Sequence, residues 1–89
     1  MQLELKGTVK EVFSKQKIND KLDRMDIVVT VDENTKYPQD IISQAINKRI
    51  ELINGIKVGD SVIVKCNVRG KGTNGKYYNQ LDIWDVIKL

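Results

Sequence analysis

Residues 46–69, INKRIELINGIKVGDSVIVKCNVR, contain the signals that decide the fold. Apolar residues recur at i, i+4 and i+7 between Ile46 and Ile53, the spacing of one helical face, and Asn54-Gly55 supplies a stop signal. From Ser61 to Arg69 apolar and polar residues alternate, which is typical of a half-buried strand. The stretch therefore predicts a short helix followed by a strand.

Strand patterns flank this stretch on both sides. Upstream, alternation predicts strands over Met1–Val12 and Met25–Val31, and a third strand runs from Tyr37 to about Ala45. Downstream, the last strand spans Tyr77–Ile87, and its apolar parity changes near Ile83, which indicates a bulge or two-sided burial there. Three strands, a short helix and two strands predict a mostly β, five-stranded OB-fold, a Greek-key barrel with the helix between strands three and four.

The composition limits the size and chemistry of the protein. A chain of 89 residues has room for one core, so we expect a single domain over residues 1–89. It has no histidine, and Cys66, its one cysteine, alternates with valines as a core residue does. The segment Gly70–Lys76 spells G-x-x-x-x-G-K, but Tyr77 replaces Ser or Thr and a strand follows, so it is no phosphate loop. We expect no enzyme, no catalytic or metal-binding residues and no cofactor.

Charge and targeting signals bear on partners and location. A net charge of +3 and a pI near 9.0 permit a polyanionic partner. No secretory leader pattern opens the chain, and no apolar run approaches the roughly 18 residues of a membrane helix. We expect a protein of the bacterial cytoplasm, or of a phage-infected host cell, with no membrane partner.

Two segments between the predicted strands are rich in positive charge. Ser14–Arg24 is interpreted as a long basic loop or hairpin tip, and Gly70–Lys76 as a glycine-rich loop with a tight turn at Asn74-Gly75. In an OB-fold these loops join strands one to two and four to five, and they bind oligonucleotides together with strands two and three. The cations expected to contact phosphates are Lys15, Lys17, Lys21, Arg24, Arg69, Lys71 and Lys76.

Aromatic side chains supply the platforms on which non-specific binders stack bases. Tyr77 and Tyr78 point to opposite faces of one strand, so we expect one to face the ligand while the other packs inward. Tyr37 opens the third strand and either stacks or plugs the barrel end. Trp84 is expected to fill the barrel interior, and Phe13 to cap the core where strand one ends.

Residues 57–86, KVGDSVIVKCNVRGKGTNGKYYNQLDIWDV, together with Tyr37-Pro38-Gln39, resemble a small OB-fold family of phages and Bacteroidetes known as domain of unknown function 3127 (DUF3127). The resemblance covers most of the chain from Leu5 onward. The motifs that carry it are Val58-Gly59-Asp60, Asn67-Val68-Arg69-Gly70, Asn74-Gly75-Lys76-Tyr77-Tyr78-Asn79, Leu81 and Trp84. Members of the family are regarded as single-stranded DNA-binding proteins, and the resemblance implies that function here.

Fold, charge and resemblance lead to one main functional expectation. We expect a sequence-independent single-stranded DNA-binding protein that acts in DNA replication, recombination or repair of a bacterial or phage genome. Its expected partners are single-stranded DNA and replication or recombination proteins. The sequence leaves open whether the chain forms a homo-oligomer. Two alternatives remain: an OB-fold adaptor that binds another protein, and a binder of single-stranded RNA.

Overall fold

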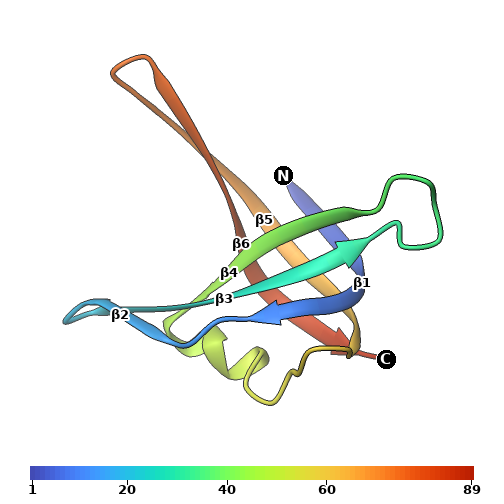
Figure 1. The fold of residues 1–89 in the computed structure, drawn as a ribbon. Helices are drawn as coiled ribbons and strands as arrows, with labels where there is room; N and C mark the ends of the chain where they lie inside the picture. Colours follow the sequence, from blue (N-terminus) through green and yellow to red (C-terminus); the bar gives the residue numbers. More distant parts are fainter.

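The strands of the computed structural model, which describes residues 1–89, form one sheet that curls into a barrel (Figure 1). The sheet order is β1-β5-β6-β4-β3-β2, and the additional pairing of β1 with β3 closes a ring of five strands. This topology is the OB-fold, as predicted. The strands are β1 (Gln2–Val12), β2 (Gln16–Asn19), β3 (Leu22–Val31), β4 (Gln39–Ile46), β5 (Ser61–Thr73) and β6 (Lys76–Lys88).

The helix predicted over residues 46–53 is present as a six-residue 3-10 helix, η1 (Asn47–Leu52), between β4 and β5. It lies beneath one end of the barrel (Figure 1). Ile53, directly after it, is fully buried in the core. No helix of the protein is long and apolar enough to cross a membrane.

The barrel closes because β1 pairs with two different strands and bends at Gly7. Residues 2–8 of β1 pair with β5, and residues 7–12 pair with β3, with a one-residue bulge between Val9 and Glu11. A Cβ atom on Gly7 would collide with the backbone carbonyl oxygen of Thr30. Only glycine therefore fits where β1 turns from one partner to the other.

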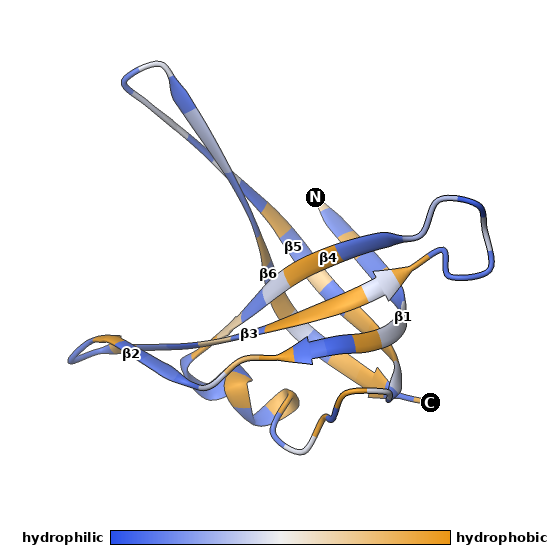
Figure 2. Cartoon of the chain, viewed as in Figure 1, coloured by the Kyte–Doolittle hydropathy of each residue, from blue (hydrophilic) through white to orange (hydrophobic).

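The core consists of side chains from five strands and the segment after η1. Cys66 belongs to it, as predicted, and burial raises the pKa of its thiol to about 11, so the thiol stays protonated at neutral pH. Figure 2 shows the hydrophobic bands along the barrel strands and the hydrophilic character of the projecting hairpins. The ten buried apolar residues are Leu5, Val9, Ile27, Val29, Ala45, Ile53, Val62, Val64, Cys66 and Ile83.

A bulge in β6 explains the change of parity near Ile83. The pairing with β5 shifts by one residue between Lys65 and Cys66, which leaves Trp84 as the extra residue. Ile83 before the bulge is buried, and Val86 after it packs against the core. The prediction that Trp84 fills the interior is wrong: it is half-buried on the outer face, where Lys65 Nζ lies 5.6 Å from its ring centroid.

Three further boundaries differ from those predicted. Segment 14–24 is largely a β-hairpin rather than an open loop, because β2 pairs with the start of β3. Segment 70–76 mostly continues the strands, so only Asn74-Gly75, both with positive φ, forms the turn. The third strand of the barrel begins at Gln39, so Tyr37 lies in the loop before it. Cross-strand hydrogen bonds keep a segment in the β-conformation even where its residues have low intrinsic β-propensity.

Candidate nucleic-acid interface

Beyond the barrel, β5 and β6 continue as a two-stranded hairpin, residues 69–80, termed the arm (Figure 1). In an antiparallel pair, residues opposite each other share a face, and consecutive pairs alternate between faces. One face of the arm is continuous with the exterior of the barrel, and it holds three cations and one tyrosine. The pairs on this outer face are Arg69 with Gln80, Lys71 with Tyr78 and Thr73 with Lys76.

Tyr77 lies on the opposite, inner face of the arm. It pairs with Gly72, and a Cβ added to that glycine would lie 2.8 Å from Cε1 of the tyrosine, so the ring covers the glycine. Gly70 and Asn79 form the next pair on this face. The two tyrosines point to opposite faces, as predicted, but the expectation that one packs inward is wrong. Tyr77 and Tyr78 are both exposed because the arm projects beyond the core.

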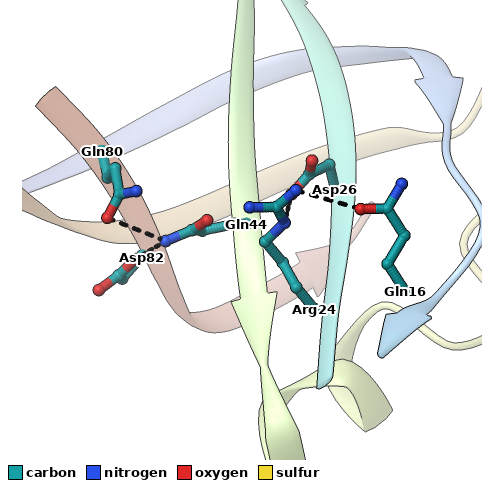
Figure 3. Close-up of polar contacts among 6 residues, drawn as sticks. All are labelled: Gln16, Arg24, Asp26, Gln44, Gln80 and Asp82. Carbon is teal, nitrogen blue, oxygen red and sulfur yellow. Dashed lines mark hydrogen bonds and ion pairs between the residues drawn. The ribbon is translucent and has the colours of Figure 1, made fainter. Parts of the chain in front are cut away.

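At the root of the arm, Arg69 is bound to a buried carboxylate. Arg69 Nη1 lies 3.0 Å from Oδ2 of Asp82, which is 9% exposed. Gln44 Nε2 donates to the other oxygen of Asp82 at 2.6 Å and lies 3.4 Å from Gln80 Oε1 (Figure 3). Gln44 and Asp82 also form the single strand pair between β4 and β6. Arg69 is therefore exposed but already paired with a carboxylate.

The hairpin of β2 and β3 places one predicted cation, Arg24, on the outer face of the barrel. Arg24 Nη2 donates to Gln16 Oε1 at 3.1 Å, and Nε lies 3.7 Å from Asp26 Oδ1 (Figure 3). Lys21 lies at the exposed tip, where its backbone N–H donates to Asn19 Oδ1 at 2.9 Å. Only Arg24 thus joins the outer face directly, and it is paired with an aspartate.

The other two predicted cations of this hairpin do not share that face. Lys17 is opposite Asp23, one residue out of phase with Arg24. Lys15 lines a small hollow together with Asp23 and residues of η1. Lys15 and Lys17 therefore lie on a different face from Arg24, because the two faces of a hairpin alternate.

Between the two hairpins, the outer faces of β3 and β4 carry paired acids and no aromatic residue. Asp40 accepts hydrogen bonds from Lys10 Nζ at 2.6 Å and from Thr30 Oγ1 at 2.7 Å. These bonds lower the pKa of the Asp40 carboxyl, and the bond to Asp40 raises the pKa of Lys10. Asp26 and Asp82 are also paired with cations. The one cation in these two strands, Arg24, is therefore already paired with a carboxylate.

A groove of about 520 Å³ opens between β4 and the root of the arm. Because β4 and β6 share a single pair, the two strands separate on the arm side of it, as Figure 1 shows. The apolar side chains that line the groove are Met1, Leu3, Ile41, Ile42, Val68 and Leu81. The sequence indicated no such groove, because it depends on how two distant strands meet.

Tyr37 and Phe13 lie apart from the arm. Tyr37 is exposed in the loop between β3 and β4, and Lys36 Nζ lies 5.8 Å from its ring centroid. Figure 1 shows this loop at the end of β3 remote from the β2 hairpin. Phe13 follows β1 and is 39% exposed, so the expectation that it caps the core is wrong. Neither aromatic residue joins Tyr78 on one surface.

Solved structures with the same fold include two single-stranded DNA-binding proteins and a domain of the protein PriB. The yeast (S. cerevisiae) mitochondrial single-stranded DNA-binding protein Rim1 is 11% identical, with a TM-score of 0.82 over 100% of this chain and 95% of its own. The dimeric N-terminal domain of PriB from Thermoanaerobacter tencongensis is 14% identical, with a TM-score of 0.72 over 99% and 94%. The small single-stranded DNA-binding protein of Streptomyces coelicolor is 18% identical, with a TM-score of 0.57 over 99% and 93%. At these identities the likeness establishes the fold.

Sequence comparison adds a family. No curated protein matches the chain significantly. The profile of the family described as "Domain of unknown function (DUF3127)" matches residues 4–87, which is nearly the whole chain.

Proposed function

The chain belongs to the DUF3127 family, and we propose that it is a single-stranded DNA-binding protein that holds the sugar-phosphate backbone without reading base sequence. The observation that carries the proposal is the outer face of the arm, where Lys71 and Lys76 flank Tyr78. A row of cations beside an aromatic platform is the combination used by non-specific single-strand binders. Rim1, which shares the fold, is described as a single-stranded DNA-binding protein.

The electrostatics of the arm support this proposal. Lys71 and Lys76 take part in no ion pair, so each is available to neutralise a phosphate. Tyr78 stands directly across the strand pair from Lys71, so a base stacked on its ring would leave the neighbouring phosphate beside the lysine. Neither contact depends on which base is present. The protein acts by binding alone, without catalysis or cofactor, in replication, recombination or repair of DNA.

Fluorescence anisotropy of a labelled oligo-dT, titrated with the protein at several salt concentrations, tests the proposal. We expect binding at low salt that weakens as salt rises, with a log-log slope of about −0.7 for each phosphate neutralised. The double variant Lys71→Glu with Lys76→Glu should reduce the magnitude of the slope by about 1.4, for two lost contacts. The matched control is Lys48→Glu with Lys57→Glu, which changes two exposed lysines by η1 and should leave the slope unchanged.

Two outcomes would replace the proposal with another function. A clear preference for oligo-U over oligo-dT in competition would make RNA the ligand. Failure of the wild type to bind oligo-dT at low salt, together with a protein partner that survives nuclease treatment and high salt, would favour an adaptor.

A further inference from the structure

We propose that the groove between β4 and the arm binds an unstacked nucleobase, an inference that rests on the proposed function and assigns a second subsite to it. Single-stranded nucleic acid combines an anionic backbone with neutral, flat bases. The protein offers a matching pair of surfaces: the outer face of the arm carries cations, and the groove at its root is lined by many apolar side chains.

The shape and lining of the groove suit a flat, largely apolar ring. Ile42 of β4 forms one wall and is 53% exposed, while Val68 and Leu81 at the arm root form the facing wall. The exposed apolar surface at Ile42 would be removed from water by a bound base, which favours binding by the hydrophobic effect. The groove volume of about 520 Å³ leaves room for a base together with its sugar.

Polar groups in the groove can form hydrogen bonds with the polar edge of any base. The amide side chains of Asn79 and Gln80 line the groove, and each amide both donates and accepts hydrogen bonds, whereas the amide nitrogen of Gln44 is already bonded to Asp82. Rotatable amides accept different bases, which agrees with binding that ignores sequence.

The charges in the groove favour a neutral occupant. No lysine or arginine lines it, whereas the carboxylates of Asp26 and Asp40 do. Lys10 and Arg24 already pair with these two carboxylates, so a phosphate or an acidic peptide would find no free cation in the groove. A nucleobase is uncharged, and its phosphate can remain on the outer face of the arm with Lys71 and Lys76. Charge complementarity therefore selects a base over an acidic peptide segment.

Tyr77 lies on the face of the arm that also carries Asn79, one of the residues lining the groove. It lies one pair further from the barrel than Asn79, and its ring is held over Gly72. One face of the ring covers the glycine backbone, and the side chain is 83% exposed. The inner face of the arm therefore presents a stacking platform next to the amides of the groove. This assigns the two tyrosines different partners: Tyr78 serves the cationic outer face and Tyr77 the groove.

The test compares oligo-dT with an abasic oligomer of equal length, which keeps the phosphates and lacks the bases. We expect the wild type to bind oligo-dT about 100-fold more tightly than the abasic oligomer, because Tyr78 and the groove each hold a base. Tyr77→Ala with Asn79→Leu should lower this ratio about tenfold, to the preference that Tyr78 alone provides, while affinity for the abasic oligomer stays unchanged. Lys71→Glu with Lys76→Glu should weaken both oligomers and keep the ratio. Asn54→Leu, which removes an exposed amide after η1, is the control for Asn79→Leu.

The outcomes separate the groove from the proposed function. Equal wild-type affinity for both oligomers, or a ratio that Tyr77→Ala with Asn79→Leu leaves unchanged, would overturn the base subsite and leave backbone binding intact. No binding of either oligomer at low salt would overturn the proposed function and the subsite with it.

Discussion

The arm and the hairpin of β2 and β3 are both basic β-hairpins, yet they distribute their charges in opposite ways. In the arm, Arg69, Lys71 and Lys76 fall on one face with Tyr78. In the β2 hairpin, the pairing shifts between Lys17 and Asn19, and the cations are divided between two faces. The two segments have similar charge in the sequence and different surfaces in the fold.

The register of a hairpin, more than its composition, decides whether its charged side chains lie on one surface. A two-residue turn at Asn74-Gly75 sets an uninterrupted register, so every second residue of the arm adds to one surface. The one-residue shift in the β2 hairpin breaks that sequence, and Asp23 stands opposite Lys17.

Charge reversal should give the largest difference between the hairpins. We expect Lys71→Glu with Lys76→Glu to weaken binding of oligo-dT on the order of 100-fold at low salt, because two phosphate contacts become repulsions. Lys15→Glu with Lys17→Glu makes the same change in net charge and should weaken binding only severalfold. Anisotropy titration measures both variants. Similar losses in the two variants would show that overall charge, and not the face of the arm, governs binding.

Removal of the outer tyrosine should have the next largest effect. Tyr78→Ala should weaken binding of oligo-dT about tenfold, since one base stack contributes about 1 to 3 kcal/mol. Ile18→Ala removes an exposed apolar side chain of the β2 hairpin and should leave affinity unchanged. Both variants keep the net charge, so the salt slope should be the same as in the wild type. A changed slope in Tyr78→Ala would mean that the variant alters the arm itself.

Release of the paired arginines should produce a smaller gain. Asp82→Asn frees Arg69 on the outer face of the arm while the introduced amide can still pair with Gln44, and we expect affinity to rise about threefold. Asp26→Asn makes the equivalent change beside Arg24 and should raise affinity less, since that pair is longer at 3.7 Å. Thermal unfolding of both variants checks that the fold persists. An unchanged affinity in Asp82→Asn would show that Arg69 does not contact the ligand.

The smallest effect concerns the barrel face between the hairpins. The pKa of Asp40 is lower in the folded protein than its usual value of 3.8, so its bonds to Lys10 and Thr30 stabilise the fold above that pH. This contribution is lost as the pH falls through the lowered pKa. We expect Asp40→Asn to lower Tm slightly at neutral pH and to match the wild type near pH 2. A difference in Tm that persists near pH 2 would contradict this assignment.

Much of the fold and part of the site follow from local patterns. Alternation identified the barrel strands and most of the core, and the Asn74-Gly75 turn was recognised. A two-residue turn at Asn74-Gly75 also places Lys71 opposite Tyr78 if the strands continue up to the turn. The glycine-rich segment is interpreted from the sequence as a loop, so this pairing is not predicted. The wrong placement of Trp84 has a different cause, because a one-residue bulge decides which way a side chain points.

The sequence by itself determined the strand order, the buried face of most strands and the excess of positive charge in two hairpins, because these depend on neighbours within one or two strands. Only the tertiary structure decided which cations remain free, because Arg24 and Arg69 meet their carboxylates through side-chain placement in the folded sheet. It alone created the groove, because β4 and β6 are distant in the chain and meet at a single pair when the barrel closes. Period-two patterns describe the faces of one strand, whereas a groove depends on where two strands part.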